Sequence, residues 1–129
     1  MDIKKYDFKN ADQVINMGGP WIGDFYYDDS FISKNVIVDN LLFSDNKVYF
    51  VKYHSLSKKR SDIFFTICCW DIDIKSLSES TQTFNVLYLR EIINDKEMII
   101  CNTFHGEMPE SCFNFIITPE AFRPVSNII

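Results

Sequence analysis

The sequence contains few of the residues from which enzyme active sites are usually built. Only two histidines occur, His54 and His105, and each is expected at the end of a strand, before a loop. The G-x-S-x-G elbow, the phosphate-binding loop and the dinucleotide fingerprint are absent, and "FHGE" (104–107) lacks a helical histidine pair for zinc. We therefore expect no catalytic residues, no cofactor and no metal. An enzyme would require His54 or His105 beside a cysteine or carboxylate in a cleft.

Long apolar runs are missing as well. Nothing approaches 18 consecutive apolar residues, so no transmembrane helix and no membrane partner are expected. The first residues, "MDIKKYDFKN", lack the apolar segment of a secretory signal. These features indicate a cytoplasmic protein. In that compartment Cys68, Cys69, Cys101 and Cys112 are expected as reduced thiols, with at least two of them buried.

Positive charge is in deficit. The chain has 13 Lys and Arg against 18 Asp and Glu, which gives a net charge of -5. A phosphate backbone repels such a charge, so direct nucleic-acid binding is disfavoured. An acidic surface suits a basic protein partner, because complementary fields steer association.

Apolar and aromatic residues, in contrast, are abundant. Hydrophobic residues make up 47% of the 129 positions, and the chain has twelve Phe and six Tyr. This length and composition indicate a single domain over residues 1–129 with a packed core. Aromatic and β-branched residues favour strands, so the composition predicts a β-rich fold.

The order of apolar runs and turn signals predicts about seven strands. A short helix is expected over 10–17, between the N-cap Asn10 and Gly18. Ser44-Asp45-Asn46 and "NDK" (94–96) are turn signals that predict two hairpins. The fold class is thus mainly β: an antiparallel sandwich or small barrel with one short N-terminal helix. The predicted strands span 21–26, 35–43, 47–53, 62–74, 83–93, 97–104 and 112–119.

Two of these strands, 47–53 and 62–74, are apolar on both faces. Alternation in 62–74 places these apolar residues on one face, with Thr66 as the polar exception: Phe64, Cys68, Trp70, Ile72 and Ile74. The neighbours Cys68 and Cys69 are consequently expected on opposite faces. A strand that is apolar on both faces is expected in the centre of a sandwich, under a helix, or at an interface.

The stretch "MGGPWIGDFYYDD" (17–29) raises the question of a binding loop. We expect Trp21 to pack into the core as the strand begins, so that its replacement by alanine costs about 3–5 kcal/mol. Tyr26, Tyr27, Asp28 and Asp29 are expected to follow in a loop. Exposed tyrosine beside aspartate is typical of a protein interface, and an ordinary solvated loop is the alternative.

Asp71 and Asp73 share one face of a predicted strand. They could hold a hard cation or act as an acid/base pair, but no third ligand follows in register. We favour simple exposure to water. Further interface candidates are chosen for charge and expected loop position: Asp71, Asp73, Glu79, Glu107 and Glu110.

Residues 18–54 resemble a known class of protein. "GGPWIG", the acidic and aromatic segment after it, and the strands "VIVDNLLFSD" and "KVYFVKY" are similar in order to small acidic β-rich immunity proteins. Bacteria encode these beside polymorphic toxins, as in contact-dependent growth inhibition. The resemblance implies a monomeric cytoplasmic antidote that binds one cognate toxin C-terminal domain. That domain is often a basic nuclease, and its active site or substrate groove would be blocked.

Other functions stay open at this stage. Gly19-Pro20-Trp21 resembles the G-x-W of lipocalins, although a later T-D-Y-like segment is missing. A barrel that carries a small apolar ligand is therefore the main alternative. A structural domain with another partner is a further one.

Overall fold

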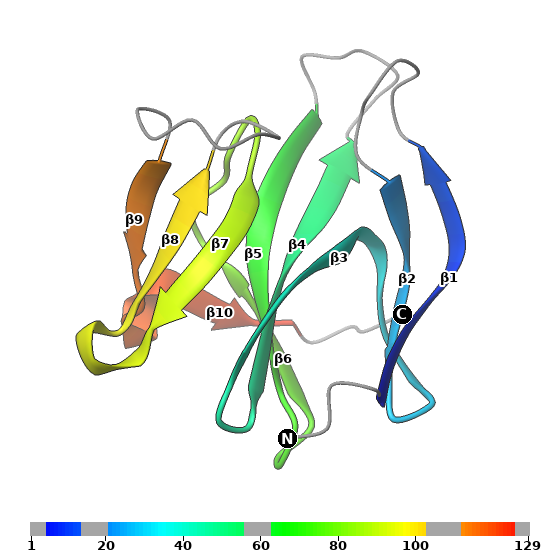
Figure 1. Cartoon of the computed structure of the whole chain (residues 1–129), viewed down its shortest axis with the longest axis horizontal. Coiled ribbons are helices and arrows are strands. Elements are labelled where there is room, and N and C mark those ends of the chain that lie inside the picture. Colours follow the sequence, from blue (N-terminus) through cyan, green and yellow to red (C-terminus); the bar gives the residue numbers. More distant parts are fainter. Residues whose placement is uncertain (1–4, 14–20, 56–62, 103–111, 126–129) are drawn as a thin grey trace.

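The structure, a computed structural model, describes residues 5–13, 21–55, 63–102 and 112–125 (Figure 1). These residues form antiparallel strands joined by turns, and short 3-10 helices lie at Asn94–Lys96 (η3) and Pro119–Ala121 (η5). No helix in the described part of the chain is long and apolar enough to cross a membrane. The strands are β1 (Tyr6–Gln13), β2 (Trp21–Tyr27), β3 (Ser30–Ser44), β4 (Lys47–Ser55), β5 (Ile63–Asp71), β6 (Ser76–Ser80), β7 (Tyr88–Ile93), β8 (Met98–Asn102), β9 (Cys112–Ile116) and β10 (Phe122–Pro124).

The strands form two sheets. The larger has the order β1-β2-β3-β4-β5-β6-β10, and the smaller has the order β7-β8-β9. The predicted mainly β, antiparallel class is confirmed. The sheets are not closed into a barrel, which corrects the barrel alternative.

Each of the seven predicted strands overlaps an observed one, and three strands were not predicted: β1, β6 and β10. The helix expected over 10–17 is wrong for residues 10–13, which belong to β1. Residues 14–17 lie outside the described residues. Residues 10–13 are extended along β2 instead: Asp12 faces Ile22, Gln13 faces Trp21, and the Asn10 side-chain amide donates to Asp24 Oδ2 at 2.8 Å.

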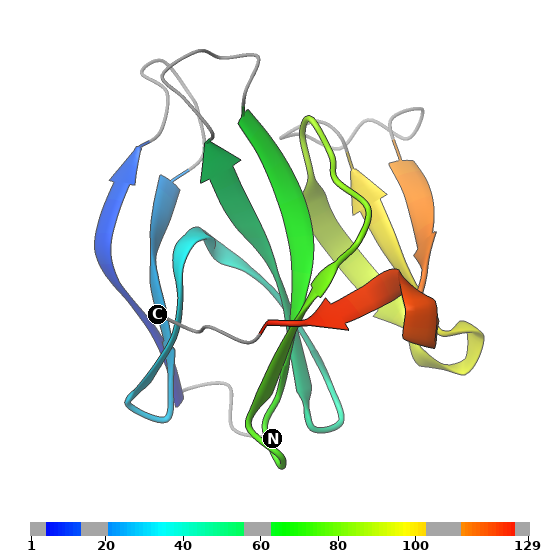
Figure 2. The same ribbon diagram turned by 180° about the vertical axis from the view of Figure 1, so that it is seen from behind.

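β3 bends back on itself. It is 15 residues long and has positive φ at Asn35 (59°) and Asp39 (62°). Its register with β4 shifts between Val36 and Leu41. Asn and Asp tolerate this backbone region better than other L residues. Figures 1 and 2 show the consequence: β3 rises from the β2–β3 turn, arches over and returns to the same end of the molecule.

The core has two parts, one on each face of β4 and β5. Between the two sheets, residues Tyr49, Val51, Phe65 and Ile67 of the larger sheet form one cluster with Leu89, Ile99, Cys101 and Phe115 of the smaller sheet and with Leu87, which directly precedes β7. On the other face, β2 and the arch of β3 close over β4, β5 and β6, with Phe25, Val36, Val48, Phe50 and Cys68 at the centre.

The two-part core confirms several expectations. β4 and β5 are apolar on both faces because both faces are covered. Cys68 and Cys69 point into different parts of the core, as predicted. All four cysteines are free, and Cys68, Cys69 and Cys101 are buried. The Ser44-Asp45-Asn46 hairpin is also confirmed, with Asp45 at φ 51° in the turn.

Two expectations about apolar residues are wrong. Trp21 is 54% exposed, because it is the first residue of β2 and lies beyond the core. Ile74 is 71% exposed, because β5 ends at Asp71 and the chain then turns. The glycine of this stretch with a defined packing role is Gly23: a Cβ there would lie 3.0 Å from the carbonyl oxygen of Lys9 on β1.

Candidate functional site

Four turns lie together at one end of the molecule, the lower end in Figures 1 and 2. They are the β2–β3 turn at 28–29, the β3–β4 turn at 45–46, the β5–β6 turn at 72–75 and the β7–β8 turn at Asn94–Lys96. We call this surface the turn end. The arch of β3 is what brings the first two turns to the same end, although they lie at opposite ends of one strand.

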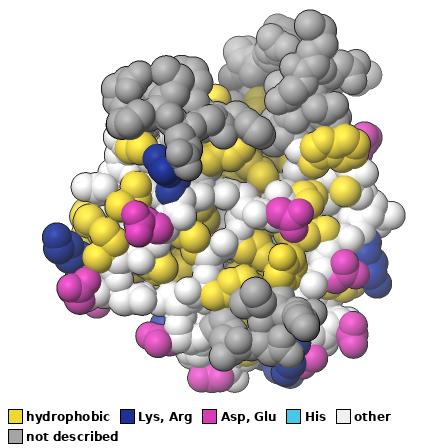
Figure 3. Space-filling model, in the orientation of Figure 1, with side chains coloured by type: hydrophobic (Ala, Val, Ile, Leu, Met, Phe, Trp, Pro, Cys, Tyr) yellow, Lys and Arg dark blue, Asp and Glu magenta, His cyan; other side chains and the backbone are white. Residues whose placement is uncertain are grey.

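The turn end is rich in carboxylates. Lys47, Lys75 and Lys96 lie among them, so acidic residues outnumber basic ones here. In Figure 3, Asp and Glu side chains follow the lower rim of the molecule. The carboxylates carried by these turns and the strand residues next to them are Asp28, Asp29, Asp45, Asp71, Asp73, Asp95 and Glu97.

Hydrogen bonds join three of the turns. The Asn46 side-chain amide donates to Asp71 Oδ1 at 3.0 Å and to Asp73 Oδ2 at 3.1 Å, which links the β3–β4 turn to the β5–β6 turn. The backbone N–H of Ile72 donates to the Asn46 carbonyl at 2.7 Å. The Ser44 hydroxyl donates to the Asn94 side chain and so reaches the β7–β8 turn on the other sheet. The carboxylates of these three turns are therefore held on a connected framework.

A pocket of about 210 Å³ opens at the turn end, between the β3–β4 and β7–β8 hairpins. Its apolar lining comes from Tyr49, Ile92 and Ile117, and carboxylates stand at Asp45 and Glu97. Burial raises the pKa of the Tyr49 hydroxyl above its usual range, so this group stays neutral. An apolar lining with carboxylates matches a side chain with an aliphatic stem and a cationic head. The full lining is Ser44, Asp45, Lys47, Tyr49, Ile92, Asn94, Glu97 and Ile117.

Four predicted interface residues belong to the turn end. Asp28 and Asp29 are exposed and form a two-residue turn with φ of 51° and 64°, the left-handed geometry that suits a tight hairpin. Asp71 is half-buried and Asp73 is exposed. Asp71 also accepts the backbone N–H groups of Asp73 and Ile74, so it orders its own turn.

The other predicted interface residues lie elsewhere. Tyr27 was expected in a loop, but it is only 6% exposed, because alternation along β2 turns it into the core beside Phe25. Tyr26 is half-buried on the opposite face of β2, under Lys9 Nζ at 4.4 Å from its ring centre. Glu79 lies within β6 and not in a loop. Glu107 and Glu110 lie outside the described residues.

Glu79 belongs to a polar cluster that the sequence did not predict. His54 Nε2 and the Thr66 hydroxyl each lie 2.7 Å from Glu79 Oε2, and His54 stacks on Phe64 with ring centres 4.6 Å apart. The hydrogen bond from His54 is the main cause that lowers the pKa of Glu79 to about 2, against the effect of burial. The cluster follows from strand pairing, which sets β4 and β6 on either side of β5.

This cluster places a histidine beside a carboxylate, the arrangement that an enzyme would require. The nearest thiol is Cys68, whose Sγ lies 4.0 Å from Thr66 Oγ1. Burial raises the pKa of Cys68 to about 12, so it stays a thiol and is no nucleophile at neutral pH. Among the described residues, no group of three or more His, Cys, Asp or Glu side chains could hold a metal ion.

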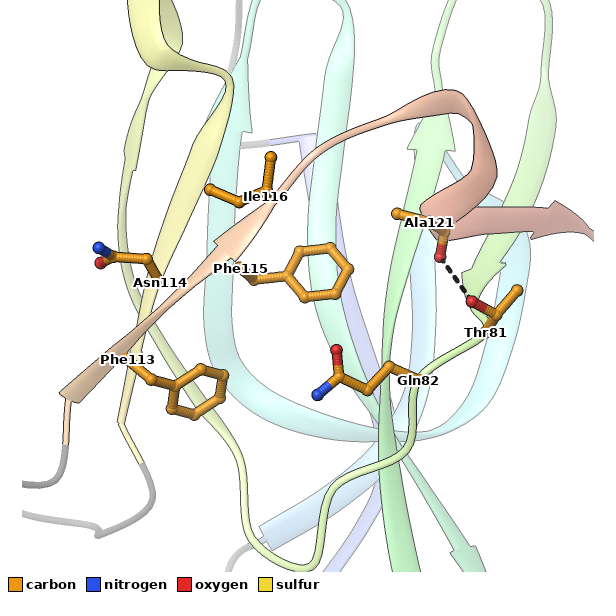
Figure 4. A pocket seen from close by; sticks show the side chains of 7 residues that line it. All are labelled: Thr81, Gln82, Phe113, Asn114, Phe115, Ile116 and Ala121. Carbon is orange, nitrogen blue, oxygen red and sulfur yellow. Dashed lines mark hydrogen bonds between the residues drawn. The ribbon is translucent and has the colours of Figure 1, made fainter.

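A second pocket, of about 290 Å³, lies at the side of the molecule beside β9. Figure 4 shows Phe113 and Phe115 of β9 on one wall and Gln82 opposite them. The Thr81 hydroxyl contacts the Ala121 carbonyl at 3.5 Å on the same side.

No known family, no curated protein and no solved structure matches this chain. The class is therefore defined by fold and site: a small antiparallel β protein of two packed sheets, with carboxylates gathered on linked turns around a small pocket. The sequence indicated Asp28, Asp29, Asp71 and Asp73 of this surface. It missed Asp45, Asp95 and Glu97, which lie in or directly after predicted turns, because their proximity depends on the contact from Ser44 to Asn94 between the two sheets.

Proposed function

We propose that this protein is an immunity protein, which binds a cognate toxin domain through the turn end and blocks it. The observation that carries the proposal is the set of carboxylates on linked turns around the pocket. This proposal agrees with the resemblance of residues 18–54 to small acidic immunity proteins. The bound domain would be a basic one, and a nuclease is the class of toxin that fits best.

Attraction between the carboxylates of the turn end and a basic toxin surface would speed their association. A basic nuclease surface binds phosphates, and an array of carboxylates can occupy the same surface in their place. Complementary charge raises association rates, by about 10- to 1,000-fold where fields are strongly focused. Because three of the turns are hydrogen-bonded to one another, less side-chain and loop entropy is lost when the surface is covered.

The pocket would supply the anchor. An arginine or lysine of the toxin can lay its stem along Tyr49 and Ile92 and place its charge near Asp45 and Glu97. Interfaces gain most of their affinity from a few such residues in well-packed pockets. A catalytic arginine or lysine of the toxin would be masked directly by this contact.

The proposed function requires binding and no catalytic step. We interpret the cluster of His54, Thr66 and Glu79 as a stabilising polar contact across β4, β5 and β6, with Glu79 ionised at neutral pH. The protein would act in the cytoplasm of the cell that makes the toxin, as one copy per toxin. Free cysteines agree with that reducing compartment.

The test is to pair the protein with its neighbour in the genome. The C-terminal domain of the protein encoded immediately upstream is expressed in a host with and without this chain, and survival is counted. The complex is then titrated by calorimetry, with a toxin domain from another system as the control. We expect the host to survive when this chain is present. We also expect a dissociation constant in the nanomolar range, which corresponds to a binding free energy of about -12 kcal/mol. Toxicity that persists, with no heat of binding, would refute the proposal.

A further inference from the structure

β9 is the outer strand of the smaller sheet. It pairs with β8 on one side, and no described strand lies on the other. Figures 1 and 2 agree that β9 is at the periphery of the molecule. An unpaired strand edge is a template for pairing with another chain.

The register shows which backbone groups face outward. Ile117 donates its backbone N–H to the Glu97 carbonyl at 2.8 Å, so these two residues form a hydrogen-bonded pair. Pairs alternate in an antiparallel ladder, so Phe113 and Phe115 bond to β8. The N–H and C=O groups of Asn114 and Ile116 consequently point away from β8, towards the open edge.

The other sheet edges carry features that discourage pairing. β1 has charged residues, and its register with β2 is irregular between Lys9 and Asp12. β10 is only three residues long and ends in Pro124. β7 is covered by Asn40 of the larger sheet: its amide donates to the Leu89 carbonyl and accepts the Leu89 N–H, both at 2.9 Å.

β9 has none of these features. Its sequence, "CFNFI", contains no charge and no proline, and its register with β8 is unbroken. Ile116 is 54% exposed. In Figure 4 the rings of Phe113 and Phe115 point towards Gln82, and the Asn114 side chain points to the other side of β9. At Asn114 and Ile116 the strand thus presents backbone groups that no described strand pairs, beside the exposed apolar side chain of Ile116.

We propose that β9 pairs with β9 of a second copy of this chain, antiparallel, about a two-fold axis at Asn114. In this register Asn114 faces Asn114, Phe113 faces Phe115, and Cys112 faces Ile116. The outward N–H and C=O groups of one copy meet those of the other, as a two-fold interface requires. Aromatic and apolar cross-strand pairs of this kind stabilise sheets.

Charge explains why a second copy suits this edge. Each chain carries a net charge of -5, so two copies can approach closely only where carboxylates are absent. β9 offers such a strip. The pocket beside it would be closed on its open side by the second copy. A five-residue strand is short, so the dimer would be weak and concentration-dependent.

The test is sedimentation velocity on the full chain without any partner, from ~10 μM to ~1 mM, a range that spans weak association. The sedimentation coefficient should rise towards that of a dimer. Ile116→Lys replaces the apolar side chain that faces Cys112 of the second copy with a charged one and should weaken dimerisation at least ~10-fold. Val86→Lys is the matched control, since Val86 is 41% exposed and lies outside β9, and it should dimerise like the wild type.

Amide hydrogen exchange supplies the second readout. The N–H groups of Asn114 and Ile116 should exchange more slowly as the concentration rises. A wild type that stays monomeric, or an Ile116→Lys variant that dimerises like the wild type, would overturn the proposal. Protection of these amides only after a toxin domain is added would also overturn it and would assign the edge to that partner. Since self-association is measured alone, its failure leaves the proposed function standing.

Discussion

Trp21 and Phe25 lie four residues apart on the same face of β2, yet Phe25 is fully buried and Trp21 is 54% exposed. Side-chain type alone favours burial of both. The difference comes from position along the strand, because the arch of β3 covers Phe25 and Tyr27 but not the first residue of β2.

Alanine substitutions at these two positions should therefore differ widely. Trp21→Ala should lower the free energy of unfolding by less than about 1 kcal/mol, as is usual for surface residues. Phe25→Ala should lower it by about 3–5 kcal/mol, because it empties a core site. Urea unfolding of both variants measures the difference. Equal losses would contradict the placement of Trp21 outside the core.

Glu79 should make stability depend on pH. Its pKa falls from 4.5 to about 2 in the folded protein, mainly through the hydrogen bond from His54. A lowered carboxyl pKa contributes stability above the unfolded value, and this contribution is lost as the pH falls from about 4.5 to about 2. The loss should be at most about 3 kcal/mol.

Glu79→Gln should remove that part of the pH dependence, since glutamine does not titrate. Free energies of unfolding are compared at several pH values between about 2 and 6 for the wild type, Glu79→Gln and the exposed-site control Glu91→Gln. Glu91→Gln should keep the wild-type slope. A Glu79→Gln variant with an unchanged slope would show that other carboxylates cause the acid sensitivity.

At the level of elements, the arch of β3 depends on backbone conformation. Asp39 is exposed and has φ of 62°, so its side chain contributes little packing. The left-handed region costs a non-glycine residue about 1–2 kcal/mol, and most for β-branched side chains. The identity of this residue should therefore influence stability through the backbone.

Asp39→Val should destabilise the protein by about 1–2 kcal/mol, whereas Asp39→Gly should be neutral or slightly stabilising. Thermal unfolding of both variants tests the order. The same substitutions at Lys34, an exposed β3 residue without positive φ, are the control, and there valine should be the better residue. Similar behaviour at both positions would mean that the arch does not depend on left-handed geometry.

Strands with a strong apolar pattern could be predicted from the sequence, and strands fixed by tertiary pairing could not. β4, β5 and β8 follow the apolar runs of the sequence and the turn residues beside them closely. β6, "SLSES", has little apolar signal and exists because it pairs with β5. β10 is only three residues long. Residues 10–13 of β1 suggest a helix start because Asn10 resembles an N-cap, but Asn10 has φ of 56° at an irregular point of the strand.

For the whole molecule, the candidate site depends on long-range geometry. Local turn signals at 44–46 and 94–96 were visible in the sequence, and so were Asp28, Asp29, Asp71 and Asp73. Their meeting at one end could not be predicted, because it requires the arch of β3 and the contact from Ser44 to Asn94 across the two sheets. The His54 cluster likewise depends on residues brought together by β4, β5 and β6.

The central claim is that the turn end binds the toxin, and the most direct measurement is calorimetry with two matched variants. Glu97→Lys reverses a charge in the turn-end pocket, and Glu91→Lys makes the same change at an exposed position on β7. Glu97 already has positive φ (49°), so lysine adds no new backbone strain there. We expect Glu97→Lys to weaken toxin binding at least ~10-fold and Glu91→Lys to change it less than ~2-fold. Equal affinities for the two variants would contradict the account.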